Sequence, residues 1–396
     1  KNVPELRFPG FEGEYSLDIF GNLATNKSEK FNPQNENASI DIELDCIEQN
    51  TGRLIKIYNS KEFSSQKNKF NPQNVLYGKL RPYLNKYYFT KKSGVCSSEI
   101  WVLKSTKEDK LLNLFLYYFI QTKRYSDVAS KSAGSKMPRA DWGLIENIRV
   151  YFPELCEQQK IGQFFSKLDR QIELEEQKLE LLQQQKKGYM QKIFSQELRF
   201  KDENGNDYPD WEEKQLGELS QIVRGASPRP IKDPKWFNKE SDIGWLRISD
   251  VTNQNGKIYH LEQKLSIEGQ EKTRVLVTTH LLLSIAASIG KPVMNFVKTG
   301  VHDGFLIFLN PKFNLFFMYY WLEYFKDKWS KYGQPGSQVN LNTEIVKSQT
   351  LNMPSNHEQE KVGQFFNRNE KLIELQQEKI MYLKRRKQVL LQKMFI

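Results

Sequence analysis

Two short polar segments carry side chains suited to binding chemistry in this sequence. The first is SAGSKMPRADW (132–142), and the second is QPGSQVNLN (334–342). Each contains a glycine–serine pair followed by hydrogen-bonding groups, and each precedes a long repeated segment by about twenty residues. Arginine, asparagine, glutamine and serine can hydrogen-bond to base edges, and lysine and arginine neutralise phosphates. These residue types in exposed loops suit the recognition of double-stranded DNA, although an ordinary solvated loop remains the alternative.

Other loop segments have the same composition, but some of their residues have a structural alternative. Arg81-Pro82-Tyr83 could form a structural turn with Tyr83 in the core, and Arg247 could pair with Asp250 in place of a base. The two glycine–serine loops hold different polar residues at equivalent places, as two different half-sites would require. The candidate DNA-contacting residues are Lys79, Arg81, Tyr83, Lys86, Ser135, Lys136, Arg139, Arg224, Ser227, Arg229, Arg247, Ser249, Gln334, Ser337, Gln338 and Asn340.

The elements that must position these loops include a long helical segment that occurs twice. Residues 153–194 and 354–395 align without a gap at an offset of 201 and are identical at 17 of 42 positions. Unrelated segments agree at roughly one position in twenty, so the chain is an internal duplication. Leu6-Arg7-Phe8 recurs as Leu198-Arg199-Phe200, and Tyr15–Leu23 aligns with Trp211–Leu219. The regions between the helices diverge, so the helices keep one packing geometry while the globular regions present different surfaces.

Both copies of the helix have an apolar seam at heptad spacing, which is a coiled-coil signal. Polar residues recur at matching registers, Glu175 with Gln376 and Lys186 with Lys387, and buried polar positions fix register. We therefore predict an antiparallel coiled coil of about 34 residues and ~50 Å per helix. Each helix begins with two adjacent phenylalanines, Phe164-Phe165 and Phe365-Phe366. One of each pair fits the seam, and the other faces away from it, toward a partner or toward its own globular domain. The coiled-coil and partner residues predicted are Phe164, Phe165, Ile172, Leu179, Leu182, Phe365, Phe366, Ile373, Ile380 and Leu383.

Composition favours a cytoplasmic protein that meets a polyanion. The net charge is +11, with +6 in residues 1–152 and only +1 in residues 201–353. The three cysteines form no CxxC pair, which favours a reducing compartment. The apolar runs Leu111–Ile120 and Leu281–Ala287 are too short to span a bilayer, so we expect no membrane partner. The near-neutral second region suggests that phosphate-binding charge comes from local patches or from partner subunits.

Short β-branched and aromatic runs between turns predict mixed α and β structure in each globular region. The expected strands are Leu54–Tyr58, Tyr87–Thr90, Glu99–Leu103, Trp245–Ile248, Leu282–Ile285 and Phe305–Leu309, and the expected buried helices are Leu111–Gln121 and Leu315–Lys326. The predicted fold class is α+β, with two mixed α/β globular domains, two long helices forming an antiparallel coiled coil, and internal pseudo-two-fold symmetry. The expected segments are 1–152 and 201–353 for the globular domains, and 153–200 and 354–396 for the helices.

The chain resembles the specificity subunit of type I DNA restriction–modification enzymes over essentially its whole length. The resemblance rests on the helix openings EQQKIGQFF and EQEKVGQFF, on PELRFPGF near the start, and on QELRFKDENGNDYPDWEEKQLGEL between the halves. The segments LRPYLNK (80–86) and WLRISDV (245–251) support it. No single motif decides the resemblance, but their order along the chain does.

The resemblance implies a non-catalytic subunit that reads a bipartite, asymmetric DNA target. Each globular domain would read one half, and the paired helices would set the spacing and dock two methyltransferase subunits. Those subunits would methylate adenine with S-adenosylmethionine, and motor-nuclease subunits using ATP and magnesium would cut unmodified DNA. The chain itself would bind no cofactor.

The sequence lacks the motifs of the catalytic partners. No GxxxxGK[ST] phosphate loop occurs, and Asn32-Pro33-Gln34 and Asn71-Pro72-Gln73 lack the second proline and the aromatic of an adenine methyltransferase signature. The four histidines have no metal-ligand spacing, and His302 beside Phe305–Leu309 is expected to be structural. Two other interpretations remain: a stand-alone bipartite DNA-binding regulator, and a coiled-coil scaffold for proteins.

Overall fold

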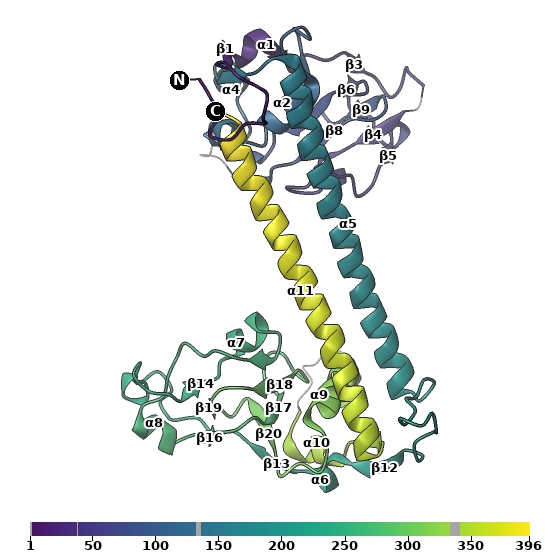
Figure 1. Cartoon of the computed structure of the whole chain (residues 1–396), viewed down its shortest axis with the longest axis vertical. Helices are drawn as coiled ribbons and strands as arrows, with labels where there is room; N and C mark the ends of the chain where they lie inside the picture. The colour runs from purple at the N-terminus through teal and green to yellow at the C-terminus, as the bar shows by residue number, and fades with distance from the viewer. Residues whose placement is uncertain (1, 38, 132–135, 333–340) are drawn as a thin grey trace. The chain divides into compact units, whose positions relative to one another are not determined.

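The computed structural model describes residues 2–37, 39–131, 136–332 and 341–396. The chain divides into two compact units, Lys1–Lys178 with Gln377–Ile396, and Leu179–Gln376. Two long helices, α5 (Leu155–Phe194) and α11 (Asn356–Met394), each belong partly to both units. Each unit therefore combines one globular domain with a section of both helices (Figure 1).

The first unit contains three sheets in its described residues. Their strand orders are β2-β10-β7-β8, β3-β6-β9-β4-β5 and β1-β11. The strands are β1 (Ser16–Ile19), β2 (Ala24–Thr25), β3 (Lys30–Phe31), β4 (Ile40–Ile42), β5 (Tyr58–Asn59), β6 (Lys67–Phe70), β7 (Val75–Gly78), β8 (Tyr87–Phe89), β9 (Gly94–Cys96), β10 (Ile100–Ser105) and β11 (Arg149–Phe152). The short helices are α1 (Phe20–Leu23), α2 (Asn113–Phe119), α3 (Lys123–Ala129) and α4 (Trp142–Ile145).

The second unit repeats this plan with one extra strand in the sheet that matches β2-β10-β7-β8 and two fewer strands in the sheet that matches β3-β6-β9-β4-β5. The strand orders are β13-β20-β17-β18-β15, β14-β19-β16 and β12-β21. The strands are β12 (Glu212–Gln215), β13 (Gln221–Arg224), β14 (Gly244–Trp245), β15 (Lys257–Ile258), β16 (Arg274–Leu276), β17 (Leu281–Ser284), β18 (Pro292–Asn295), β19 (Thr299–Val301), β20 (Phe305–Leu309) and β21 (Thr350–Met353). The helices are α6 (Leu216–Leu219), α7 (Ile248–Asn253), α8 (Ile267–Glu271), α9 (Leu315–Phe325) and α10 (Thr343–Ser348).

Most of the strands expected from the sequence are present, but two differ. The predicted strand Leu54–Tyr58 is wrong over most of its length: Leu54 makes only an isolated bridge to Ile47, and a strand begins at Tyr58. The side chains between them, Ile55 and Ile57, are exposed, so no sheet face holds them. The predicted strand Trp245–Ile248 ends at Trp245, because the Asp250 carboxylate accepts the Arg247 backbone N–H and starts α7.

The helices α2 and α9 are buried on nearly all sides, as their continuous apolar sequences predict. In α2, the rings of Phe115 and Tyr118 are at most 1% exposed, and α9 buries Phe317 and Tyr320 completely. Each of them shares a core with the long helices: Phe165 joins the core of the first unit, and Phe366 joins that of the second. Full burial of such rings stabilises each unit by about 1.5–3 kcal/mol per side chain.

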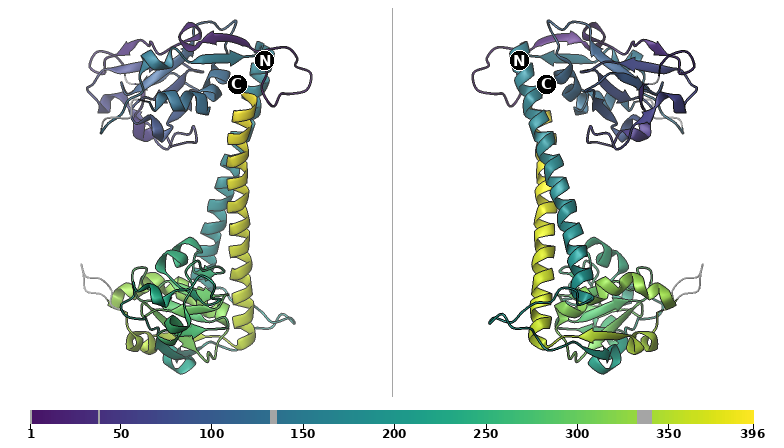
Figure 2. Two further views of the ribbon diagram at one scale, coloured as in Figure 1. Left: turned by 90° about the vertical axis from the view of Figure 1, so that its left-hand side faces the viewer. Right: turned by 90° about the vertical axis from the view of Figure 1, so that its right-hand side faces the viewer.

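The long helices run antiparallel to each other within each unit (Figure 2). In the first unit, Asp169 of α5 pairs with Lys387 of α11, whereas Glu175, further along α5, pairs with Lys379, earlier in α11. In the second unit, Lys186 pairs with Glu370. Two mixed α/β domains together with these antiparallel helices confirm the predicted fold class.

The two units repeat each other's contacts, as an internal duplication predicts. The Leu198 backbone N–H donates to the Lys192 carbonyl at the end of α5, over 3.0 Å. The Leu6 N–H donates to the Lys393 carbonyl at the end of α11, over 2.9 Å, although these residues lie at opposite ends of the chain. The N-terminal segment therefore follows α11 in space as Leu198 follows α5 in sequence, and the two termini lie close together (Figure 1).

Candidate nucleic-acid interface

In the first domain, the structure brings two of the predicted DNA-contacting segments together. The loop between β7 and β8 lies beside the segment that carries Arg139, through an isolated antiparallel bridge between Leu80 and Arg139. The Arg81 N–H donates to the Pro138 carbonyl over 2.7 Å, and the Ala140 N–H donates to the Lys79 carbonyl over 2.8 Å. These backbone bonds fix one exposed surface from segments that are more than fifty residues apart in the sequence.

Some side chains on this surface are exposed without an ion pair, and others are hydrogen-bonded to the protein. Arg81 has a left-handed backbone (φ 52°), and its guanidinium is exposed with no ion pair among the described residues. Tyr83 is 57% exposed, so the alternative that placed it in the core is wrong. Arg139 forms a two-pronged bond with Glu99, at 2.9 Å for both contacts, which lowers the pKa of that carboxyl. The Lys86 ammonium donates to the Leu44 carbonyl, and Lys136 is exposed.

In the second domain, Arg224, Ser227 and Arg229 gather around one aspartate. The Ser227 hydroxyl donates to Asp303 Oδ1 over 2.7 Å, and Arg229 Nη2 donates to Asp303 Oδ2 over 2.9 Å. Arg224 Nε donates to the Asp303 backbone carbonyl over 2.6 Å. The bond from Ser227, followed by the charges of Arg229 and Arg224, holds the pKa of the Asp303 carboxyl below its usual value. Asp303 therefore orders this cationic surface at pH 7.

Arg247 is held by Asp250, which is the alternative that the sequence left open. Its Nε and Nη2 donate to the two Asp250 oxygens over 3.1 and 3.0 Å. This hydrogen bonding raises the pKa of the guanidinium, so Arg247 stays charged. Ser249, in the first turn of α7, is exposed. Ser135, Gln334, Ser337, Gln338 and Asn340, also predicted to contact DNA, lie outside the described residues.

The predicted seam residues lie along the facing sides of α5 and α11. Phe165 and Phe366 are fully buried, and Ile172, Ile373, Ile380 and Leu383 are buried as well. Leu179 and Leu182 are half-buried. Phe164 and Phe365 pack on their own chain: Phe164 lies 5.5 Å from Phe8 between ring centroids, and Phe365 lies 5.4 Å from Phe200.

Near its start, each long helix carries a buried carboxylate that was not predicted from the sequence. Glu358 is fully buried and accepts two bonds from Arg199, over 3.2 and 2.8 Å, and one from the Trp211 indole over 3.0 Å. Glu157 is 1% exposed and accepts the equivalent bonds from Arg7, over 2.9 and 2.7 Å, and one from the Tyr15 hydroxyl over 3.2 Å. The signal was present, because Arg7 and Tyr15 align with Arg199 and Trp211 in the internal repeat. Each of these carboxylate clusters, Glu157 with Arg7 and Tyr15 and Glu358 with Arg199 and Trp211, connects the segment before a globular domain to the long helix that follows that domain.

The sequence profile of the type I restriction modification DNA specificity domain matches residues 16–184 and 208–385, which together make up most of the chain. The chain belongs to this family. A type I restriction enzyme specificity subunit, MjaVIII from Methanocaldococcus jannaschii, is 26% identical over 315 residues, covering 72% of this chain and 70% of that protein. The EcoDI specificity subunit from Escherichia coli is 26% identical over 164 residues, covering 41% of this chain and 36% of that protein.

Solved structures of specificity subunits share the fold. The type I restriction–modification S subunit from M. genitalium matches with a TM-score of 0.58 at 14% identity, covering the whole of this chain and 99% of that one. A chain from a structural study of type I restriction–modification complex assembly matches with a TM-score of 0.61 at 17% identity, covering 96% of this chain and 97% of that one. These structures confirm the fold, and the profile match over most of the chain confirms the family resemblance.

Within the described residues, no group of three or more His, Cys, Asp or Glu side chains could hold a metal ion. Among the helices of those same residues, none is long and apolar enough to cross a membrane.

Proposed function

We propose that this specificity subunit reads a bipartite, asymmetric DNA target within a type I restriction–modification complex and has no catalytic activity of its own. The observation that carries the proposal is that the DNA specificity profile matches twice, once in each half of the chain. The two halves differ in their exposed loop chemistry, as two different half-sites would require. For the organisation of the chain we keep the four segments expected from the sequence: domains at 1–152 and 201–353, and helical spacers at 153–200 and 354–396.

The spacing of the two half-sites would follow from the length of the helices. The helices α5 and α11 contain 40 and 39 residues, and a helix rises ~1.5 Å per residue. Methyltransferase subunits that use S-adenosylmethionine would dock on this helix pair, and a motor-nuclease using ATP and magnesium would complete the complex. Mapping methylated adenines across the genome that encodes the chain would test the target directly. A bipartite methylated motif that disappears when this gene is deleted supports the proposal, and an unchanged methylation pattern would contradict it.

In the first domain, Arg81 is the contact whose loss we expect to reduce DNA affinity most clearly. Its exposed guanidinium has no ion pair among the described residues, so it can meet a phosphate without losing an internal partner. We expect Arg81→Ala to weaken DNA binding by the assembled complex and to reduce the slope of log affinity against log salt by about 1. A salt series of gel-shift titrations measures both. Exposed Lys92 offers a control as Lys92→Ala, because it lies outside the loop.

Docking of the methyltransferase would use an exposed apolar stripe on α11. Tyr382 and Val389 lie one heptad apart and are 62% and 40% exposed, on a face of the first unit's section of α11 that the seam does not use. We expect the double substitution Tyr382→Asp and Val389→Asp to weaken association with the methyltransferase at least ~10-fold, or about 1.4 kcal/mol. Co-purification and a binding titration measure the loss. The control is exposed Gln392→Asp on the same helix, and equal association by both variants would exclude this stripe.

DNA affinity is expected to depend on that partner. The second domain is nearly neutral, so its phosphate-binding charge would come from local patches, such as Arg224 and Arg229, or from partner subunits. A gel-shift titration of the chain alone should therefore show much weaker binding than the same titration with the methyltransferase present. Equal affinity in both experiments would point to a stand-alone DNA-binding regulator.

A further inference from the structure

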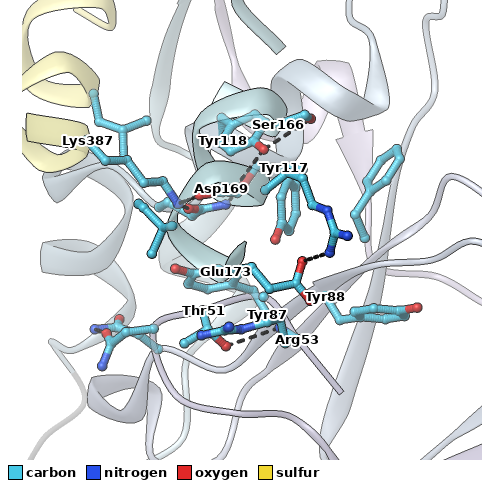
Figure 3. A pocket seen from close by; sticks show the side chains of 18 of the residues that line it. Thr51, Arg53, Tyr87, Tyr88, Tyr117, Tyr118, Ser166, Asp169, Glu173 and Lys387 are labelled. Carbon is cyan, nitrogen blue, oxygen red and sulfur yellow. Dashed lines mark hydrogen bonds and ion pairs between the residues drawn. The ribbon is translucent and has the colours of Figure 1, made fainter. Parts of the chain in front are cut away.

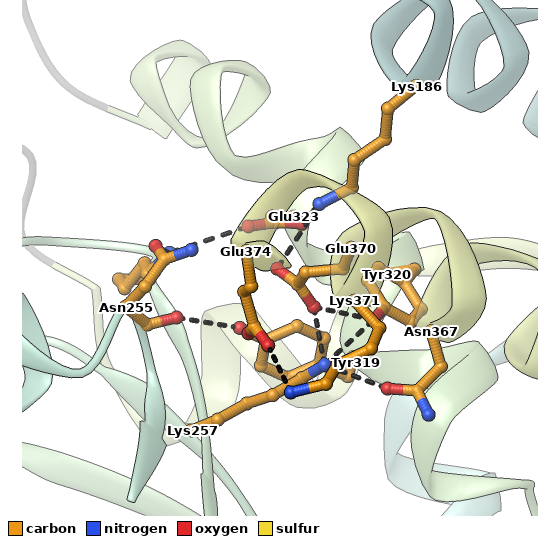
Figure 4. Close-up of polar contacts among 11 residues, drawn as sticks. Lys186, Asn255, Lys257, Tyr319, Tyr320, Glu323, Asn367, Glu370, Lys371 and Glu374 are labelled. Atoms are coloured by element: carbon orange, nitrogen blue, oxygen red, sulfur yellow. Dashed lines mark hydrogen bonds and ion pairs between the residues drawn. The ribbon is translucent and has the colours of Figure 1, made fainter. Parts of the chain in front are cut away.

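The second unit holds a buried lysine at the junction of its domain with the long helices. Lys257, on the edge strand β15, is 7% exposed at its side chain. Its ammonium pairs with Glu370 of α11, donates to the Tyr320 hydroxyl over 3.0 Å and donates to Asn367 Oδ1 over 2.9 Å. Figure 4 shows Lys186 and Lys257 approaching Glu370 from different sides. Burial alone would raise the pKa of Glu370, but the charges of Lys186 and Lys257 outweigh it and lower the pKa.

The first unit reproduces the centre of this cluster but has no counterpart of Lys257 there. Asp169 stands at the position of Glu370, Lys387 at that of Lys186, and Tyr118 at that of Tyr320. The Lys387 ammonium lies 2.6 Å from Asp169 Oδ1, and the Tyr118 hydroxyl donates to Asp169 Oδ2 over 2.8 Å. Lys387 also donates to Gln121 over 2.9 Å, as Lys186 does to Glu323. The carboxylate of the first unit therefore has one ammonium partner, whereas Glu370 has two.

The strand that carries Lys257 has no counterpart beside β8. In the second unit, β15 pairs in parallel with β18, which is the edge strand of the four strands common to both sheets. In the first unit, the equivalent strand β8 ends the described sheet. A cavity of about 950 Å³ lies there, between β8, the loop 49–54, α2 and the two long helices (Figure 3). That volume is within the range of small-molecule sites.

Two buried tyrosines on the wall of this cavity lack a hydrogen-bond partner. Tyr87 and Tyr117 are 6% and 5% exposed, and within the described part of the chain neither hydroxyl is bonded. The loop 49–54 approaches closely at Gly52, where a Cβ would lie 1.9 Å from the Tyr117 hydroxyl oxygen. A side chain at position 52 would therefore collide with this hydroxyl. Neither hydroxyl is among the described atoms that are closed off from solvent without a partner, so both open onto the cavity, where they could bond a ligand.

The charges of the two units are compatible with one more cation in the first. The cluster of the second unit contains three ammonium groups (Lys186, Lys257 and Lys291) and two carboxylates (Glu323 and Glu370). The central pair of the first unit is balanced, with Lys387 on Asp169. With an added ammonium, the pair of Lys387 and Asp169 would match the centre of the second cluster, where Lys186 and Lys257 both face Glu370. Four of the five cations on the cavity wall already have carboxylate partners, namely Arg53, Arg170, Lys384 and Lys387, and the fifth, Lys91, has none among the described residues.

We propose that this cavity binds a primary alkylammonium group, which takes the place that Lys257 fills in the second unit. Asp169 would form an ion pair with the ammonium. The Tyr118 hydroxyl would accept a hydrogen bond from it while donating to Asp169, as the Tyr320 hydroxyl does between Lys257 and Glu370. The ammonium comes from a free polyamine or from a lysine of a partner protein. Occupancy would bond the first domain to the helices in the way that Lys257 bonds the second domain. The proposal does not depend on DNA recognition.

The test uses the full-length chain and n-butylammonium, with n-butanol as the neutral control of the same shape. Ligand-observed NMR titration should show saturable binding of the amine and none of the alcohol. Tyr117→Phe removes a hydroxyl with no described partner, so it should weaken amine binding at least threefold with an unchanged melting temperature. Asp169→Asn should weaken binding at least tenfold, and exposed Glu180→Gln should leave it unchanged. Equal binding of amine and alcohol, or wild-type affinity in both cavity variants, would overturn the proposal.

The second unit supplies an independent test by chemical rescue. Lys257→Ala vacates the equivalent place and leaves Glu370 with one ammonium partner, so its melting temperature should fall. Added n-butylammonium should restore much of that loss, and n-butanol should not. Failure of the amine to rescue Lys257→Ala would show that this arrangement of carboxylate and tyrosine does not select a free ammonium, and the inference for the first unit would fall with it.

Two further experiments separate the two sources of the ammonium. If a free polyamine is the ligand, spermidine should bind the isolated chain and remain bound in the assembled complex. If a partner lysine is the ligand, adding the methyltransferase subunit should displace bound n-butylammonium, and reductive methylation should leave one partner lysine protected by the complex. An assembled complex that neither retains spermidine nor protects a lysine would contradict both sources and the proposal.

Discussion

Replacing Glu358 with alanine is expected to lower the free energy of unfolding of the second unit by about 3–5 kcal/mol, because a buried charge pair loses one member. The carboxylate is fully buried and accepts three bonds, two from Arg199 and one from Trp211. Its removal leaves the buried Trp211 N–H without that acceptor and leaves Arg199 with only the more distant carboxylate of Asp210, at 3.7 Å. Denaturant unfolding followed by tryptophan fluorescence measures the change.

The neighbouring Glu360 provides the matched control for this prediction. It lies on the same turn region of α11 but is exposed, so Glu360→Ala should change the free energy of unfolding by less than about 0.5 kcal/mol. Glu157→Ala should destabilise the first unit in the same way, because Arg7 and Tyr15 make the equivalent bonds. If Glu358→Ala lowers the free energy of unfolding by less than 1 kcal/mol, the contacts of Glu358 with Arg199 and Trp211 do not stabilise the second unit.

The sequence predicted the parts of the fold that follow from periodicity and duplication. The heptad seam located both long helices, and continuous apolar runs located α2 and α9. Strands with a continuous apolar and aromatic sequence, such as β20, were also predictable. The strand expected at Leu54–Tyr58 failed because its isoleucines belong to an exposed segment, and local residue preference does not report whether a neighbouring strand exists.

The sequence predicted which residue types the candidate site contains, but not which carboxylates hydrogen-bond to them in the folded protein. The sequence placed Arg224, Ser227 and Arg229 in one group, but Asp303, which orders them, lies more than seventy residues further along the chain. Arg139 and Arg247 likewise satisfy part of their hydrogen bonding with Glu99 and Asp250. A sequence shows which residues have DNA-binding chemistry, whereas the fold decides which of those groups are already engaged inside the protein.

A change of oligomeric state is expected when the chain is shortened to its first globular domain and α5. A fragment of residues 1–196 should form a homodimer, because the half of α5 near its end can replace the section of α11 in the first unit. At the offset of 201, Lys186 stands for Lys387, so it can pair with Asp169 of a second copy. The apolar contacts are kept as well, since Leu182, Met190 and Ile193 stand for Leu383, Leu391 and Met394. Sedimentation equilibrium should report a dimer at micromolar concentration.

Ending the fragment before Leu198 matters for this experiment. Arg199 occupies in the second unit the place that Arg7 occupies in the first, so a longer fragment would bring two arginines to one Glu157. Lys186→Glu should abolish the dimer, because it places a carboxylate opposite Asp169 in both halves of the symmetric pair, and Asp169→Lys in the same fragment should restore it by reversing the charges. A fragment that is folded but monomeric would contradict the packing equivalence of the two helices. A dimer that persists in Lys186→Glu would instead show that the apolar seam alone determines pairing, and that the repeated lysine is not what fixes its register.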